Sequence, residues 1–214
     1  MGSMTRTGNG TDVDGSRVAL VVCGALAAET AEIVRRRRWD VDIRGVSAFH
    51  HLASPRIVED VEKKLADLAG RYARVVVVYG DCGTGGALDE VLARYGAVRP
   101  PGVHCYQWFL EEEAQEIVDR RTSTYFFTDW LVRNWDRAVV RGLGLDRFPW
   151  LKETYFGSLR EILYLRQDPD PELERRALEI AEYMGLPMAI RDTGTTALEA
   201  QLALLMEGSS QKSV

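Results

Sequence analysis

The pattern of apolar and polar positions predicts alternating strands and helices along most of the chain. Two runs, residues 17–25 and 75–79, are almost entirely apolar, and each leads into a glycine-containing turn. Such runs are typical of parallel strands that are buried on both faces because helices cover both sides of the sheet. Shorter strands are predicted at residues 40–46, 103–106, 122–127, 162–165 and 188–190.

Helices are predicted between most of these strands, at residues 28–38, 55–70, 87–95, 111–121, 129–141, 171–184 and 195–206. The helix at 55–70 shows the pattern best, with Pro55 in its first turn and an apolar stripe formed by Val58, Val61, Leu65 and Leu68. Residues 145–155 read as an irregular connection. The alternation predicts a three-layer, Rossmann-like α/β fold, in which one largely parallel sheet carries helices on both faces.

The length of 214 residues allows one large domain or two small ones. Residues 1–16 and 208–214 are small and polar, and we expect both ends to be disordered. We expect residues 17–207 to form a single α/β domain. A division into two lobes near residues 121–146 is the alternative.

Charge and composition exclude some classes of function. The formal net charge of −5 gives no basic surface for nucleic acid, and the basic run at residues 35–38 complements the dipole at the end of a predicted helix. The apolar runs are too short to span a membrane, and no signal peptide is visible. Three cysteines, an odd number, argue against a disulfide framework, so we expect a cytoplasmic protein with reduced thiols.

Every cysteine and histidine falls at the carboxyl end of a predicted strand or in the loop that follows it: Cys23, His50, His51, Cys82, His104 and Cys105. Parallel strands bring these ends to the same edge of a sheet, so the six side chains can converge on one site. Thiolates combined with imidazoles suit zinc or iron. We therefore predict a metal site formed by Cys23, His51, Cys82 and Cys105, with His104 as an alternative to Cys105.

A structural interpretation competes with this one. No Cys-x-x-Cys or His-x-x-x-His pair is present, and a cysteine at the end of a buried strand is most often a small apolar residue, which applies above all to Cys23. The choice between His50 and His51 as a ligand is open.

The glycine-rich turn at residues 80–86 allows two further interpretations. Cys82 precedes a predicted helix, whose N-terminus lowers a thiol pKa, so it is a candidate nucleophile with His104 or His51 as its base. Alternatively, the turn binds an anion. The sequence lacks the Lys-Ser/Thr pair of a nucleotide-binding P-loop, and the glycine spacing is not that of a dinucleotide-binding turn.

Polar side chains at the same strand ends are candidates for binding a small-molecule substrate. Asp81 and Thr84 lie in the glycine-rich turn, and Thr128 and Asp129 follow the strand at 122–127. For the second pair, capping of the next helix is the simpler alternative.

Several of these motifs together resemble one known family, the bacterial and archaeal domain-of-unknown-function family numbered sixteen thirty-eight. The motifs are Val-Cys-Gly at 22–24, the histidine loop before Pro55, Tyr-Gly-Asp-Cys-Gly at 79–83, His-Cys at 104–105, Thr-Tyr-Phe-Phe-Thr-Asp at 124–129, Gly-Leu-Gly-Leu-Asp at 142–146 and the closing segment that contains Gly194.

The resemblance implies a metal or thiol site at the shared cysteine and histidine positions. Many members are encoded beside corrinoid-dependent methyltransferases and folate one-carbon enzymes, which implies a role in methyl transfer. We therefore expect an enzyme that holds zinc or iron and acts in one-carbon transfer, with corrinoid or tetrahydrofolate held by a partner such as a corrinoid methyltransferase or corrinoid protein. The alternatives are an accessory module without chemistry of its own and a metal-free cysteine enzyme.

Overall fold

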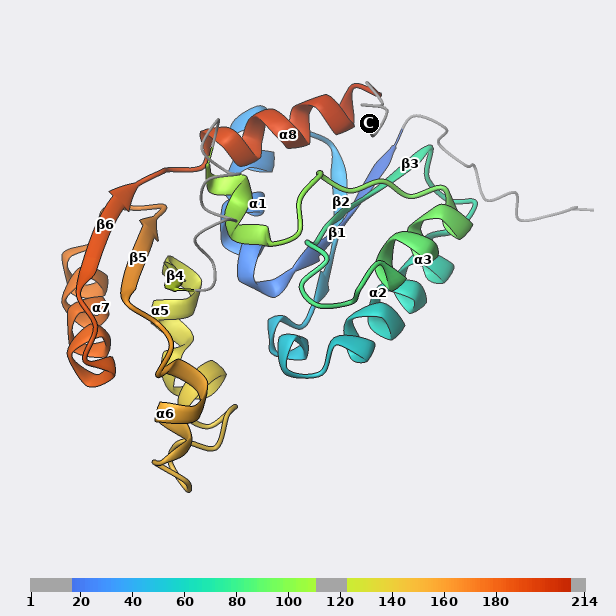
Figure 1. The fold of residues 1–214 in the computed structure, drawn as a ribbon. Coiled ribbons are helices and arrows are strands. Elements are labelled where there is room, and N and C mark those ends of the chain that lie inside the picture. Colours follow the sequence, from blue (N-terminus) through green and yellow to red (C-terminus); the bar gives the residue numbers. More distant parts are fainter. Residues whose placement is uncertain (1–16, 111–122, 209–214) are drawn as a thin grey trace, which may run out of the picture.

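The computed structural model describes residues 17–110 and 123–208, and its strands lie in two separate parallel sheets (Figure 1). The first sheet has the order β2-β1-β3, with strands β1 (Val18–Cys23), β2 (Val41–Val46) and β3 (Arg74–Val78). The second sheet has the order β4-β5-β6, with strands β4 (Thr124–Thr128), β5 (Glu161–Arg166) and β6 (Met188–Asp192). The predicted α/β class is confirmed, and two three-stranded sheets take the place of the single sheet.

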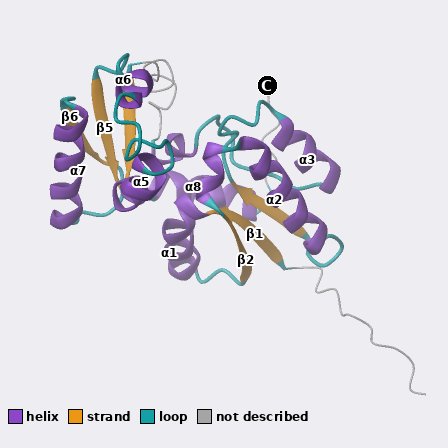
Figure 2. Ribbon diagram, turned by 90° about the horizontal axis from the view of Figure 1, so that it is seen from below, coloured by secondary structure: helices purple, strands orange, loops and turns teal. Residues whose placement is uncertain are grey.

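Along the chain, most of the described strands are followed by a helix (Figure 2). The α-helices are α1 (Ala27–Arg37), α2 (Ser54–Leu68), α3 (Ala87–Tyr95), α5 (Asp129–Trp135), α6 (Leu151–Phe156), α7 (Pro171–Met184) and α8 (Thr196–Met206). Short 3-10 helices are η1 (Gly24–Leu26), η2 (Ala48–Leu52) and η3 (Cys105–Phe109), and η4 (Asp136–Val140) is a π-helical turn. The predicted disordered ends and the predicted helix at 111–121 fall outside the described residues.

The first lobe consists of residues 17–110 together with α8. Its sheet is covered by α1 and α8 on one face and by α2 and α3 on the other (Figures 1 and 2). All six residues of β1 are buried, as expected for a central parallel strand. The stripe of α2 that faces the core consists of Ile57, Val61, Leu65 and Leu68, so Ile57 takes the place predicted for Val58.

The second lobe consists of residues 123–192. Alternate residues of its strands face opposite sides of the sheet. Phe127 and Tyr164 pack with the residues of α5 and α7, which lie against each other on one face. Phe126 and Leu165 point to the other face, where they pack with Leu110 from the end of the first lobe. One face of the second sheet therefore packs against its own helices, and the other face contacts residues of the first lobe.

Two prolines explain why the first sheet ends where it does. Val98 forms an isolated parallel bridge with Val76, and the chain then reaches Pro100 and Pro101. Proline has no N–H to donate to a strand ladder, so this segment cannot continue as a strand. The strand predicted at 103–106 is therefore wrong, since η3 begins at Cys105. The region predicted to be irregular contains the short helix α6.

The carboxyl ends of the two sheets face each other. Helix η1 follows β1 directly, and it contacts α5, which follows β4. Trp130 of α5 packs against the core of the first lobe, whereas Trp135 of the same helix is buried in the second. Helix α8 comes after β6 but buries Leu198 and Leu202 in the first lobe, so the chain crosses between the lobes twice. Within the described residues, no helix has both the length and the apolar character needed to cross a membrane.

The return of α8 to the first lobe can be tested with two leucines of the same helix. Leu202 is fully buried, whereas Leu204 is 41% exposed. We expect Leu202→Ala to lower the free energy of unfolding by about 2–4 kcal/mol because it leaves a cavity in the core, and Leu204→Ala to change it by less than about 0.5 kcal/mol. Urea unfolding measures both values. Equal losses in the two variants would contradict this placement of α8.

Candidate metal centre

Three side chains that are distant in sequence meet at the carboxyl edge of the first sheet. His51 lies in η2 after β2, Cys82 lies in the turn after β3, and Cys105 begins η3. Their ligand atoms, one ring nitrogen and two sulfurs, all lie within 4.8 Å of one another. The structure thus brings together three of the four predicted metal ligands.

Four residues of the turn at residues 80–86 have a positive φ. Cys82 has a φ of 46°, and Gly83, Gly85 and Gly86 have φ values of 86°, 63° and 90°. The left-handed region is unfavourable for a side chain such as that of Cys82, so its neighbours must hold it there.

The carboxylate of Asp81 holds this turn together. It accepts hydrogen bonds from the Thr84 hydroxyl, from the Gly85 N–H at 3.2 Å and from the Gly86 N–H at 2.9 Å. Asp81 and Thr84, predicted to bind substrate, are therefore engaged with each other and with the turn. The same carboxylate occupies the N–H groups that an anion would need, which contradicts the anion-binding interpretation.

The segment that carries Cys105 lies directly on this turn. The Cys82 N–H donates to the Val103 carbonyl at 3.0 Å. A Cβ at Gly80 would lie 2.9 Å from the Cys105 nitrogen and 3.0 Å from the Val103 oxygen, both of them backbone atoms that cannot easily give way. Glycine at position 80 is therefore required for the two cysteines to approach each other.

Side-chain hydrogen bonds fix the fold of the Cys105 segment. The Gln107 side-chain oxygen accepts from the Val103 N–H at 2.9 Å and from the His104 N–H at 2.7 Å. The Trp108 indole N–H donates to the Pro101 carbonyl at 2.6 Å. These side-chain bonds pair backbone groups of the segment that would be paired with a neighbouring strand if the segment belonged to a sheet.

His51, rather than His50, faces the cysteines. Its Nδ1 lies 2.6 Å from the Ala48 carbonyl oxygen, and its ring is stacked 5.5 Å from the ring of Tyr79. Because a carbonyl only accepts, Nδ1 carries a proton. Nε2 can then donate to Cys82 while the ring is protonated, and it offers its lone pair to a metal once that proton is lost. His50 lies elsewhere, with its Nδ1 3.7 Å from an Asp60 carboxylate oxygen.

The electrostatics of the cluster favour a thiolate at Cys82. The pKa of Cys82 is lowered to about 3, chiefly because the Cys105 thiol donates a hydrogen bond to it; burial opposes this effect, and hydrogen bonds from His104 and His51 add to it. Correspondingly, the hydrogen bond to Cys82 raises the pKa of Cys105, and burial raises it further. Burial disfavours the charged form of His51, but its interactions with Cys82 outweigh burial and raise its pKa.

His104, predicted as a catalytic base, also lies beside Cys82, to which its side chain is hydrogen-bonded. It lies outside the group of three mutually close ligand atoms. Its ring is stacked 5.0 Å from that of Tyr106. His104 thus contacts the Cys82 sulfur without belonging to the group of three close ligand atoms.

Cys23, the fourth predicted ligand, also lies outside the close group. It is fully buried, and burial raises its pKa to about 12. Its sulfur accepts the Ala25 N–H at 3.4 Å and so caps η1, while Tyr79 provides a further hydrogen bond. The structure assigns Cys23 to the core, as the structural interpretation of the sequence suggested.

Thr128 and Asp129, predicted to bind substrate, have structural partners in the second lobe. The Thr128 hydroxyl caps α5 by accepting the Leu131 N–H at 3.4 Å. Asp129 is 1% exposed and accepts three hydrogen bonds, from the Tyr164 hydroxyl and from the N–H groups of residues 167 and 168. Helix capping and turn formation explain both residues.

Sequence reasoning missed two groups near the site. Tyr79 is fully buried between Cys23 and His51, and burial raises its pKa. Glu29 is buried in the first turn of α1, and its pKa is raised by burial and, more weakly, by the charge of Asp129. Tyr79 could have been found from its position at the end of β3, whereas Glu29 carries no local signal that separates it from a surface helix residue.

Comparison with known proteins gives one match. The family described as "Protein of unknown function (DUF1638)" matches residues 47–202, which is well over half of the chain. The chain belongs to this family. No curated protein and no solved structure matches the chain.

The matched region of this DUF1638 protein contains the whole cluster. His51, Cys82, His104 and Cys105 lie within residues 47–202, whereas Cys23 lies outside them. The division agrees with the geometry, in which Cys23 stands apart from the three close ligand atoms.

The lowered pKa of Cys82 predicts an unusual reaction with iodoacetamide in metal-free protein. Only the thiolate reacts, and a thiol with an ordinary pKa gains about tenfold in rate per pH unit below that pKa. Because the pKa of Cys82 is about 3, its thiolate fraction is already complete at pH 5.5. We expect the labelling rate at Cys82, followed by peptide mass spectrometry, to stay nearly constant from pH 5.5 to 8 and to vanish in Cys82→Ser. A tenfold rise per pH unit would contradict this assignment.

Proposed function

We propose that this protein is an enzyme that binds a zinc or iron ion through His51, Cys82 and Cys105 and acts in corrinoid- or folate-dependent one-carbon transfer. The observation that carries the metal-binding part is the mutual distance of at most 4.8 Å among the three ligand atoms. The family resemblance supports the one-carbon part.

The donor set fits such a metal. Two sulfurs and one imidazole are the combination preferred by zinc and by iron, and around a tetrahedral ion their atoms lie roughly 3.5–4 Å apart. The Ala48 carbonyl holds the His51 ring in the tautomer that leaves Nε2 free. Metal binding would release the Cys105 thiol proton, which is hydrogen-bonded to Cys82, because a cysteine binds a metal as the thiolate.

Residues 17–110 and 123–208 supply three close ligands, and a set of three favours a catalytic rather than a purely structural site. Structural zinc sites have four protein ligands, whereas catalytic sites have three and leave one position for water or substrate. When bound, the ion supplies Lewis-acid chemistry and lowers the pKa of a coordinated water or thiol. His104, beside Cys82 but outside the triangle, is placed to hold or accept a proton next to the open position.

The context for this chemistry follows from the resemblance. The substrate is a small molecule, and the corrinoid or tetrahydrofolate that carries the one-carbon group is held by a partner, for which a corrinoid methyltransferase or corrinoid protein is the expected candidate. The free cysteines favour a cytoplasmic location.

A second candidate function is a metal-free cysteine enzyme. Its support is the lowered pKa of Cys82, together with the hydrogen bonds from His51 and His104, which form the nucleophile and base pairing that such enzymes need. In this alternative His104 is the general base and Cys105 is a hydrogen-bond donor to the nucleophile.

Metal content distinguishes the two candidates. We expect protein purified without a histidine tag to contain about one equivalent of zinc or iron, and Cys82→Ser and Cys105→Ser to contain less than about a tenth of that amount, because each variant loses one of three ligands. Cys23→Ser is the matched control and should retain its metal, since Cys23 lies outside the cluster.

Elemental analysis measures the metal, and circular dichroism verifies that each variant is folded. Metal retained in Cys82→Ser would contradict the proposed centre. Wild-type protein that neither contains nor takes up metal, but whose Cys82 is alkylated rapidly, would favour the cysteine enzyme.

A further inference from the structure

Both imidazoles beside Cys82 are connected to the second lobe through neighbouring aromatic rings. The first connection runs through Phe49, two residues before His51. The Arg137 guanidinium of η4 lies over the Phe49 ring, 3.9 Å from its centroid, and the Trp130 ring of α5 lies 5.6 Å from it. A cation over one ring and a second ring in tilted contact hold Phe49 firmly.

Phe49 belongs to the short turn that sets the orientation of His51. Its N–H donates to the Ser47 hydroxyl at 3.3 Å, and the carbonyl before it, that of Ala48, accepts from His51. The Leu52 side chain, which is 50% exposed, also approaches the second lobe, since a Cβ added at Gly142 would lie 2.7 Å from it. Helix η2 therefore contacts the second lobe firmly at Phe49 and lies close to it at Leu52, on either side of His51.

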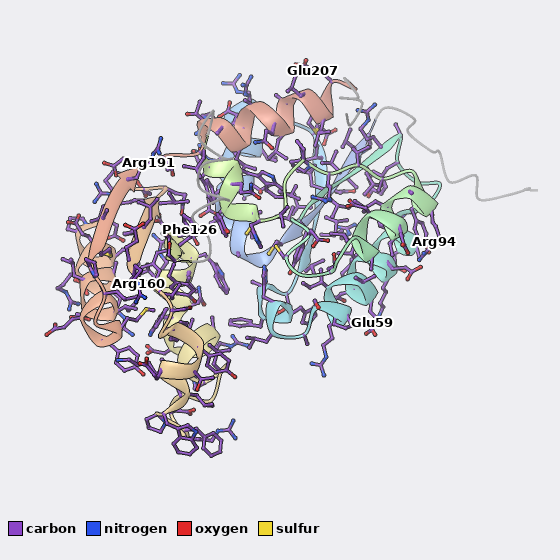
Figure 3. All side chains as sticks on the ribbon, in the orientation of Figure 1. Glu59, Arg94, Phe126, Arg160, Arg191 and Glu207 are labelled. Atoms are coloured by element: carbon purple, nitrogen blue, oxygen red, sulfur yellow. The ribbon has the colours of Figure 1, made fainter. Side chains whose placement is uncertain are left out.

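The second connection runs through Tyr106, two residues after His104. The Tyr106 ring is stacked 5.0 Å from the His104 ring and 4.6 Å from the Phe126 ring of β4, with interplanar angles of 13° and 16°. Phe126, labelled in Figure 3, packs with Leu110 from the end of the first lobe. The rings of Phe126 and Tyr106 thus form a nearly parallel stack that connects the second sheet to the imidazole beside Cys82.

We propose that the second lobe positions the two imidazoles around Cys82, with Arg137 acting on His51 through Phe49 and Phe126 acting on His104 through Tyr106. If His51 is a metal ligand, its positioning also affects metal binding, and this part of the proposal rests on the proposed function. Neither Arg137 nor Phe126 is a ligand, so each is a positioning residue. Coupling of this kind is reciprocal: metal binding at the first lobe strengthens the contacts with the second by the same factor.

The first test uses metal-free protein and hydrogen exchange followed by mass spectrometry. Arg137→Ala removes the cation from Phe49, and we expect amides at residues 48–53 to exchange at least about threefold faster, in line with the strength of an exposed cation–π contact. Arg137→Lys keeps a cation and should restore most of the protection. Arg141→Ala is the matched control, because the Arg141 side chain bonds the Asp136 carbonyl.

The second connection is tested in the same way. Phe126→Leu retains an apolar side chain but removes the ring from the stack, and we expect faster exchange at residues 103–109. Unchanged exchange in both Arg137→Ala and Phe126→Leu would overturn the proposal, as would equal protection in Arg137→Ala and Arg137→Lys.

The link to the metal is measured with Co²⁺, whose visible spectrum reports the ligand geometry. We expect Arg137→Ala to keep the sulfur-to-cobalt charge-transfer band, because both cysteines remain, while the cobalt dissociation constant rises roughly threefold to thirtyfold and the ligand-field bands shift. Faster exchange with an unchanged cobalt constant and spectrum would overturn the positioning of the metal site. Wild-type protein that binds no cobalt would refute the proposed function alone, since the exchange experiments still decide whether the second lobe positions the turn.

Discussion

The close contact between the Gly80–Cys82 turn and the segment that carries Cys105 is the constraint on which the site depends. Backbone atoms of residues 103 and 105 lie where a side chain at position 80 would stand, and the Val103 carbonyl accepts the Cys82 N–H. Cys82 consequently adopts a left-handed conformation that costs about 1–2 kcal/mol. The hydrogen bonds of Asp81 within the turn offset that strain, and the result is a pair of adjacent sulfurs.

Two neighbouring, half-buried sulfurs at the edge of the sheet create an electrostatic requirement. A thiolate in this position needs donors in place of water, and Cys82 has them in Cys105, His104 and His51. The hydrogen bond from the Cys105 thiol is the strongest of these, and it raises the pKa of Cys105. A divalent cation would satisfy the same requirement more fully, because it would stabilise both sulfurs as thiolates and use the lone pair of the imidazole. This is the physical reason for the proposed metal binding.

Much of this arrangement follows from the sequence, because strand ends are easy to place. The buried runs predicted β1 and β3, and the carboxyl ends of β3 and of the shorter strand β2 predicted where Cys82 and His51 would lie. The sequence left open whether the strands form one sheet or lie in two lobes, because the alternation of strands and helices is the same in both arrangements. It also left the role of Cys23 open: its position at a strand end resembles that of a ligand, and the direction of its sulfur, towards the Ala25 N–H, decides for the core. Contacts between lobes, such as that of Arg137 with Phe49, leave no local pattern.

X-ray absorption spectroscopy of the zinc-loaded protein tests the central claim most directly, because it counts the atoms bound to the metal and identifies them. The account predicts two sulfur ligands at about 2.3 Å and one or two nitrogen or oxygen ligands at about 2.0–2.1 Å. A first shell that contains only nitrogen and oxygen, or only one sulfur, would contradict it.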